Sequence, residues 1–528
     1  MIRKLLLSAS LFAAAWPGVA SAAWQEADSK HFVVLSNDDS QHLQKYAEQL
    51  ERFDKAMRLL RGVGDPPVST INRVTVYIVR DANEIESLSS YGVRGFYRAD
   101  ISGPVAFVPR EGPSKSSVSG SRLFTGTTGG AFDLDSDSVL RHEYSHHFMF
   151  DNFPSMALPF WFVEGFAEFH ATAIFNNDGS VTFGAPPTYR ASALLEREHL
   201  TVRELLMSDP RRMDGADIDE VYGRGWLLIH YMTFAPGRRG QLSSFLKELN
   251  QGKTPIEAAK VFGDLDALQH EMIKWLRAPK ITVETVPAAA IKIDPVTVRA
   301  LTEGEAAAMP ARIRTKAGVD RKSAGTILAM ARKLAEKYPD DVNVQLELAE
   351  AGLDAQDNAI ARAAADRIIA LSPNTEKGYI FKGRAEMAIA RAAKVTDATA
   401  WAQIRHWFVK ANRLDNLDPE ALYLFYRSYP AAGQAPTANA KAGLYQALEL
   451  LPDESSVRMT AVLQYVADGD YANASTALAP IAYGASHAKR SGGLLADLVD
   501  ALATGDKAKI DAAAAAIKGD RDKQEGQS

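Results

Sequence analysis

The first half of the chain mixes short apolar runs with longer segments of helical periodicity. Apolar and β-branched residues dominate positions 31–35, 74–79 and 104–108, and this pattern predicts three strands. Residues 40–61 repeat their apolar positions at the spacing of an amphipathic helix. The order strand, helix, strand, strand predicts a small mixed sheet in this part of the chain.

Helical periodicity resumes after residue 137. A helix is predicted over residues 138–151, because Pro154 cannot continue it. A second helix is expected to start at Pro159, since proline suits the first helical turn. One further helical pattern begins at Tyr222, and another spans residues 256–276. Residues 279–300 contain prolines and alanines that break the periodicity, so we interpret them as a linker.

Past residue 300, a proline follows the end of an apolar helical stretch again and again. The spacings between these prolines are 34, 46 and 33 residues, for Pro339, Pro373, Pro419 and Pro452. A period near 34 with a proline closing each unit resembles that of tetratricopeptide repeats. The longer interval predicts an insertion of about 12 residues within 392–400. Such repeats stack into a curved solenoid whose concave face binds extended peptides or partner proteins.

The N-terminus indicates an exported protein. Two basic residues precede an apolar run over residues 5–15, and Ala20-Ser21-Ala22 follows, which is the pattern of a signal peptide cleaved after Ala22. The apolar run is too short to span a bilayer, and no later stretch is long and apolar enough to do so. We therefore expect a periplasmic or secreted protein.

Composition narrows the possible chemistry. The 528 residues include no cysteine, so a metal site would have to use histidine and carboxylate ligands. At 46% hydrophobic residues, the chain can fold around ordinary cores without disulfides. The net charge of −5 gives no indication of nucleic-acid binding.

One short motif suggests a specific chemistry. In His142-Glu143-x-x-His146, the two histidines are four positions apart and therefore project from one face of a helix. Two imidazoles and one carboxylate form a three-ligand catalytic zinc site. Glu143 lies beside the first histidine, where a general base can accept a proton from the attacking water.

A second segment supplies the carboxylate. Glu164 lies 18 positions past His146, and Glu168 follows one helical turn later in a stretch that is otherwise apolar. Two carboxylates on a buried helix are costly unless they are paired or bound to a metal. The alternative is a structural pair of glutamates bonded to arginine side chains.

The two motifs together resemble the gluzincin branch of the zincin metallopeptidases. The resemblance implies that His142, His146 and Glu164 bind Zn²⁺ and that Glu143 is the general base. It implies that the Glu168 carboxylate contacts a ligand histidine from outside the metal site and fixes the tautomer of its ring. Gly165, beside the third ligand, is expected to let two helices approach closely.

Gluzincins stabilise the tetrahedral oxyanion with a tyrosine or histidine outside the metal helices. Tyr222 is our first candidate, at the predicted edge between a loop and a helix; His230 and Tyr231 are weaker ones. The alternative for Tyr222 is a packed aromatic side chain. We expect His147 to lie near the metal site or at the surface and not to be a ligand.

The sequence thus predicts an α+β zincin-like metallopeptidase domain, a small mixed sheet plus helices, followed by an all-α tetratricopeptide-like solenoid. The predicted divisions are a signal peptide (1–22), the metallopeptidase domain (23–278), a linker (279–300), the repeats (301–519) and a flexible tail (520–528). We expect the last helices, over 491–519, to cap the solenoid.

Two functional hypotheses follow. The first is an exported zinc endopeptidase that hydrolyses peptide bonds, with repeats that recruit a protein substrate or partner. The second is a repeat scaffold for envelope proteins with a catalytically silent or slow zincin domain. An aminopeptidase is disfavoured, because the Gly-rich exopeptidase motif is missing. Residues 126–131 resemble that motif only weakly.

Overall fold

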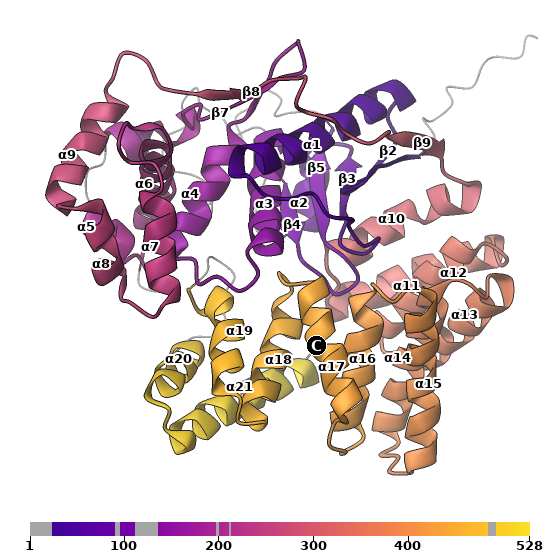
Figure 1. Cartoon of the computed structure of the whole chain (residues 1–528). Coiled ribbons are helices and arrows are strands. Elements are labelled where there is room, and N and C mark those ends of the chain that lie inside the picture. The colour runs from indigo at the N-terminus through magenta and orange to yellow at the C-terminus, as the bar shows by residue number, and fades with distance from the viewer. Residues whose placement is uncertain are drawn as a thin grey trace, which may run out of the picture.

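A computed structural model describes residues 24–89, 95–110, 136–196, 200–210, 213–483 and 493–527. The predicted signal peptide, residues 1–22, and the segment 126–131 lie outside the described residues. Figure 1 shows an N-terminal part with a central sheet above a curved array of helices.

The N-terminal part contains two sheets. A six-stranded mixed sheet has the order β4-β5-β3-β2-β1-β9, in which β5, β3 and β2 are parallel and the remaining pairs antiparallel. A small antiparallel sheet has the order β6-β7-β8. The strands are β1 (Gln25–Asp28), β2 (Phe32–Ser36), β3 (Val74–Val79), β4 (Phe96–Arg98), β5 (Val105–Pro109), β6 (Ile174–Phe175), β7 (Val181–Phe183), β8 (Glu284–Val286) and β9 (Thr297–Ala300). The three predicted strands are confirmed as β2, β3 and β5, within one residue at each end.

The helices of this part are α1 (Ser40–Arg61), α2 (Ala82–Leu88), α3 (Ser136–Asn152), α4 (Phe160–Ala171), α5 (Val202–Leu206), α6 (Gly215–Phe234), α7 (Gln241–Asn250), α8 (Pro255–Ala258) and α9 (Leu265–Leu276), with the short turns η1 (Thr188–Arg190), η2 (Ser192–Glu196) and η3 (Ala259–Phe262). The helix predicted over 40–61 has the bounds of α1. The pattern predicted over 256–276 is interrupted at Gly263, where a positive φ of 84° ends η3.

Alternate residues of each strand face two different cores, as the period of a strand requires. Val74 and Val76 of β3 belong to the core beneath α1 and α3, whereas Tyr77 and Val79 face the opposite side. On that opposite side, Met309 of the first C-terminal helix packs into the same cluster. The sheet is therefore covered on both faces, and α3 is held against one of them.

Two glycines allow α4 and α6 to touch. A Cβ atom at Gly165 would lie 2.4 Å from the backbone carbon of Gly225, and one at Gly225 would lie 2.5 Å from the carbonyl oxygen of Trp161. No larger residue fits such a contact without displacement of a backbone. The close helix approach predicted at Gly165 is confirmed.

The segment 279–300, predicted as a linker, contributes a strand to each of the two sheets. Its strand β8 pairs with β7 of the small sheet, and its strand β9 pairs with β1 at the edge of the large sheet. Val286 and Ile291 are buried in the main core. Edge pairing satisfies backbone groups of an extended segment that would otherwise bond only to water, so this segment fastens the two sheets together.

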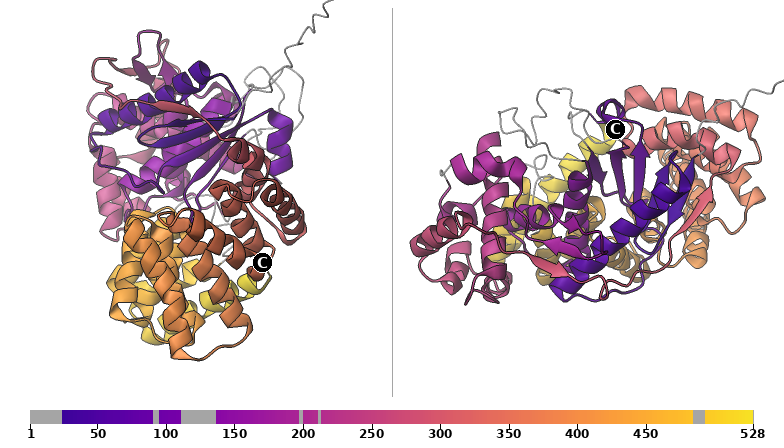
Figure 2. Two further views of the ribbon diagram at one scale, coloured as in Figure 1. Left: turned by 90° about the vertical axis from the view of Figure 1, so that its right-hand side faces the viewer. Right: turned by 90° about the horizontal axis from the view of Figure 1, so that it is seen from above.

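The C-terminal region is a solenoid of antiparallel helices (Figures 1 and 2). Its helices are α10 (Glu303–Ala317), α11 (Arg321–Lys337), α12 (Val342–Asp354), α13 (Asn358–Leu371), α14 (Glu376–Ala392), α15 (Ala398–Leu414), α16 (Pro419–Ala431), α17 (Ala438–Leu450), α18 (Ser455–Ala467), α19 (Tyr471–Tyr483), α20 (Leu494–Thr504) and α21 (Lys507–Gln527).

Each of the four spaced prolines lies where one helical hairpin ends and the next begins. The predicted insertion is spread over two helices, since α14 and α15 each have 17 residues whereas α12 and α16 each have 13. The tail predicted as frayed over 520–528 is helical as far as Gln527. Its Arg521 donates hydrogen bonds of 3.2 Å to Thr460 Oγ1, which ties the last helix to the array.

The sheet region and the solenoid are in direct contact. Ile101, in the turn between β4 and β5, packs against a cluster that contains Tyr423 of α16. Lys316 Nζ of α10 donates a hydrogen bond of 3.1 Å to Ser102 Oγ. Part of the layer formed by α10, α12, α14 and α16, whose successive members contact one another, is thus covered by the chain itself. No helix among the described residues is long and apolar enough to cross a membrane.

Candidate metal centre

The helix α3 presents the two histidines of the motif side by side. His142 and His146 are four positions apart, and their Nε2 atoms lie 3.1 Å from each other. Arg141 Nε donates a hydrogen bond of 2.8 Å to the carbonyl oxygen of Ala171, so the middle of α3 is tied to the end of α4. The predicted helix over 138–151 is confirmed within two residues at each end.

The helix α4 supplies the carboxylate. Every residue of α4 is buried, and Glu164 is only 1% exposed. Its Oε2 lies 3.4 Å from His142 Nε2 and 3.5 Å from His146 Nε2. Three atoms able to bind a metal therefore converge from two helices, as the sequence predicted for these residues.

This cluster fits a zinc ion by distance and by chemistry. Ligand bonds of about 2.0–2.1 Å to a tetrahedral ion place the ligand atoms about 3.3 Å apart, and the three observed separations are 3.1, 3.4 and 3.5 Å. Both carboxylate oxygens of Glu164 are buried, and the groups that stabilise its negative charge are the imidazoles of His146 and His142. A cation between these three side chains would be bound by one carboxylate oxygen and two imidazole nitrogens, a ligand set that zinc accepts.

The charges at the cluster are strongly coupled. Burial alone would raise the pKa of Glu164, but the imidazoles of His146 and His142 hold it far below its usual value. Burial alone would lower the pKa of His142, but Glu164, Glu168 and Glu143 raise it. The carboxylate is thus kept ionised, which is the state that binds a metal.

Tyr222 lies at the cluster, although its local setting differs from the prediction. It is inside α6, which begins seven residues earlier at Gly215, and not at the edge of a loop. Its ring stacks on that of His142, with centroids 5.8 Å apart and an angle of 5° between the planes. Burial, reinforced by the charge of Glu164, raises the pKa of the hydroxyl well above its usual value. Tyr222 therefore stays protonated and can donate a hydrogen bond.

Glu168 lies beside the candidate ligand His142, as predicted, but its hydrogen bonds go to other partners. Its Oε1 lies 3.7 Å from His142 Nδ1, which is longer than a hydrogen bond. Arg190 donates to the same oxygen from Nε at 3.1 Å and from a terminal nitrogen at 2.8 Å, and the Tyr189 hydroxyl donates to Oε2 at 2.7 Å. The arginine pairing that we weighed as the alternative therefore holds for Glu168.

Arg190 was not among the residues predicted from the sequence. Its guanidinium lies over the ring of Tyr222, 4.7 Å from the centroid, and also forms an ion pair with Asp219. Tyr222 is thus held between the imidazole of His142 and this guanidinium. The contact between Arg190 and Tyr222 depends on the packing of η1 against α6, and no local sequence motif predicts it.

Glu143 lies beside the cluster on α3 and is partly exposed. Its charge contributes to the raised pKa values of both His142 and Tyr222. The residue is therefore near the three ligand atoms and accessible to solvent, as a general base must be.

The other candidate histidines have different surroundings. His147 is buried against Asp453 of the solenoid and is not part of the ligand cluster, as expected. His230 accepts a hydrogen bond from Trp275 Nε1 at 2.9 Å and lies 2.9 Å from the carbonyl oxygen of Thr282. Tyr231 donates to Glu271 at 2.7 Å. His230 and Tyr231 are therefore engaged elsewhere in the core.

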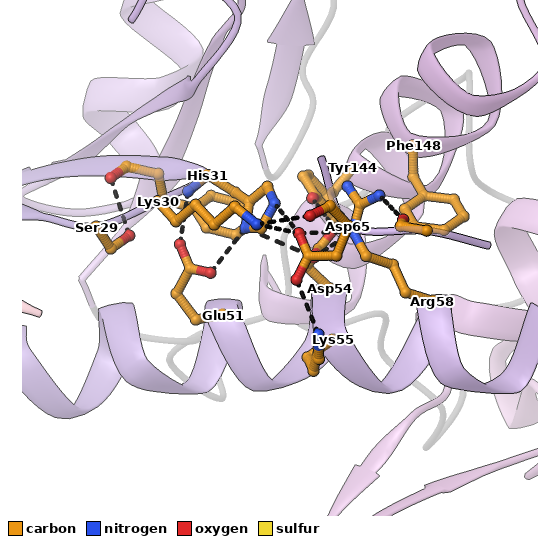
Figure 3. Close-up of polar contacts among 12 residues, drawn as sticks. Ser29, Lys30, His31, Glu51, Asp54, Lys55, Arg58, Asp65, Tyr144 and Phe148 are labelled. Carbon is orange, nitrogen blue, oxygen red and sulfur yellow. Dashed lines mark hydrogen bonds and ion pairs between the residues drawn. The ribbon is translucent and has the colours of Figure 1, made fainter. Parts of the chain in front are cut away.

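A second group with the residue types of a metal site lies beneath α3. His31, Asp54 and Asp65 have possible ligand atoms within 4.8 Å of one another. Here protein cations already neutralise the carboxylates: Arg58 Nε lies 2.7 Å from Asp54, and Lys55 Nζ lies 2.9 Å from Asp65 (Figure 3). This group is an ion-pair network.

The network also holds the helix that carries the two candidate histidine ligands. The hydroxyl of Tyr144, on α3, donates a hydrogen bond of 2.7 Å to Asp54 Oδ1 (Figure 3). Because Asp54 is fully buried on α1, the bond fixes α3 against the helix beside it.

Comparisons with known proteins give a partial likeness. No protein-family model and no curated protein matches the chain. A thermophilic TPR protein of Thermus thermophilus is 20% identical, with a TM-score of 0.27, and the match covers 34% of this chain and 90% of that one. A structure described as a MamA RS-1 ArsTM double mutant is 17% identical, with a TM-score of 0.26 and coverages of 34% and 92%. Each is matched over nearly its whole length and corresponds to about a third of this chain.

Proposed function

We propose that this protein is an exported zinc-dependent peptidase, with His142, His146 and Glu164 as the metal ligands. The observation that supports it most is the convergence of their three ligand atoms within 3.5 Å in a buried part of the protein. When bound, zinc acts as a Lewis acid towards water and towards a peptide carbonyl group.

The side chains around the cluster have separate tasks in this proposal. Glu143 accepts a proton from the attacking water as the oxygen–carbon bond forms, and it then delivers that proton to the amine nitrogen as the peptide bond breaks. The Tyr222 hydroxyl, which stays protonated, donates a hydrogen bond to the oxyanion. Arg190 keeps the Tyr222 ring in place.

The solenoid would bring a protein substrate or partner to the site. Such repeats bind proteins on their concave side. The turn at Ile101 already covers part of the layer formed by α10, α12, α14 and α16. The substrate would therefore use the remaining solenoid surface. The alternative function is a repeat scaffold without significant catalysis, for which the repeat architecture is the supporting observation.

Metal content decides between these functions. We would measure it by mass spectrometry on the mature protein, for the wild type, Glu164→Ala and Glu86→Ala, in which the control replaces an exposed glutamate. We expect about one zinc per chain in the wild type and the control, and a loss in Glu164→Ala. A wild-type protein without zinc after reconstitution would reject the peptidase and favour the scaffold.

A further inference from the structure

A carboxylate of the solenoid is buried against the metal helix. Asp453 lies in the turn between α17 and α18, 306 positions past His147. Its Oδ2 accepts a hydrogen bond of 2.7 Å from the Tyr97 hydroxyl and lies 3.1 Å from His147 Nδ1. The side chains of His147 and Asp453 are 8% and 6% exposed, so water does not compete for this contact.

A second contact comes from the same repeat. The guanidinium of Arg458, on α18, donates hydrogen bonds to the carbonyl oxygens of Pro452 and Ala477 in the solenoid. It also donates one of 3.0 Å to the carbonyl oxygen of Pro154. Pro154 lies between α3 and α4, so Arg458 joins the solenoid to the turn between the two metal-binding helices.

These contacts lie close to the ligands. His147 directly follows the ligand His146, and the turn at Pro154 separates both ligand histidines from Glu164. A shift of either contact changes how α3 is oriented relative to α4. On its other side, α3 is anchored to α1 of the N-terminal part through the hydrogen bond between Tyr144 and Asp54.

We propose that Asp453 and Arg458 are positioning residues that hold the ligands of α3 and α4 at metal-binding distance. The inference rests on the proposed function, and it gives the solenoid a task besides recruitment. Groups that orient metal ligands from outside typically contribute about 10- to 100-fold to metal affinity. If these contacts only stabilised the interface between the two regions, their removal would lower the stability and leave the metal affinity of the folded protein unaltered.

The chain offers a matched control. Asp340 follows a proline at the start of another repeat, as Asp453 follows Pro452. Its side chain is 69% exposed and pairs with Arg367 of the solenoid. Asp340→Ala therefore removes the same chemical group from the same place in a repeat without touching the metal helix.

The experiment uses the full mature protein and two readouts besides activity. Zinc affinity is measured by competition with a chromophoric chelator, and the visible absorption of the cobalt-substituted protein reports the ligand geometry. We expect Asp453→Ala to weaken zinc binding about tenfold or more and to alter the cobalt spectrum. Asp453→Asn, whose amide oxygen still accepts from Tyr97, should stay within about threefold of wild type. Arg458→Met, which keeps the aliphatic stem, should weaken binding several-fold.

The outcomes separate this inference from the proposed function. Wild-type affinity and an unchanged cobalt spectrum in both Asp453→Ala and Arg458→Met would overturn the positioning role alone. Equal losses in Asp340→Ala and Asp453→Ala would also overturn it, because general destabilisation would then explain both. If the wild type binds neither zinc nor cobalt, the proposed function fails together with this inference. If Asp453→Ala does not fold, Arg458→Met decides the matter.

Discussion

Gly165→Ala tests whether the contact between α4 and α6 sets the geometry of the metal site. The new Cβ would lie 2.4 Å from the carbonyl carbon of Gly225 and 2.6 Å from its oxygen. Carbon atoms pack best at about 3.5–4.0 Å, so the helices must move apart by about 1 Å. Because Glu164 is the adjacent residue, the displacement also moves a metal ligand away from the two histidines.

The size of the effect can be estimated from two opposing contributions. Overpacking costs about 1–3 kcal/mol, and the contact with backbone atoms puts this site at the upper end. Alanine in place of glycine stabilises the folded helix by about 1 kcal/mol through its higher helix propensity. We expect a net loss of about 2 kcal/mol, which lowers the unfolding midpoint of a domain of this size by about 4–8 °C.

The assay is thermal unfolding of the metal-free protein, followed by zinc titration. Gly325→Ala is the matched control, because Gly325 is an exposed helical residue on α11 with no atom within 4 Å of the added Cβ. The control should be stabilised by up to about 1 kcal/mol and bind zinc normally. If Gly165→Ala behaved like this control, the argument from the helix contact would be refuted.

Three further changes test the chemistry and the electrostatics. Glu143→Gln should keep its zinc, by mass spectrometry, and lower peptide hydrolysis about 10²- to 10⁴-fold; unchanged hydrolysis would exclude it as the base. Tyr222→Phe should lower kcat about 10²- to 10³-fold in the same peptide assay, and an unchanged kcat would leave it a packing residue. Burial, reinforced by Glu350, raises the pKa of Asp354 to about 6 from 3.8. The folded state then holds this proton more tightly than the unfolded chain, so stability falls as the pH rises between these values. Asp354→Asn should raise the unfolding midpoint at pH 7.5 and much less at pH 4; an equal gain at both would contradict this.

The cluster of candidate metal ligands was predictable because its geometry is local. His142 and His146 share one helix, so their spacing alone places their side chains together. Glu164 is separated from them by one short turn, and its position on an apolar helix indicated an unusual carboxylate. Tyr222 lies beside the candidate ligand His142, as the prediction required, but the start of its helix was missed. Asp214, the N-cap residue that accepts hydrogen bonds from Ala216 and Asp217, marks that start.

Other features could not be read from the sequence, because they depend on tertiary contacts. Arg190 reaches Glu168 from a short 3-10 turn that carries no motif. The strands β8 and β9 have three and four residues, too few for an alternating pattern to stand out. Their partners in the two sheets supply the pairing that the local sequence does not specify.

The position of Asp453 gives a physical reason why this solenoid and the domain with the candidate metal centre occur in one chain. A repeat array that only recruited substrate could be joined by a flexible tether. Here β9 joins the large sheet, α10 packs on that sheet, and Asp453 and Arg458 contact the helix and turn that carry the candidate ligands. A partner that bends the solenoid would therefore move these contacts. Because the ligand atoms must stay within a few tenths of an ångström of their positions to bind a metal, such a partner would change metal affinity without touching the site.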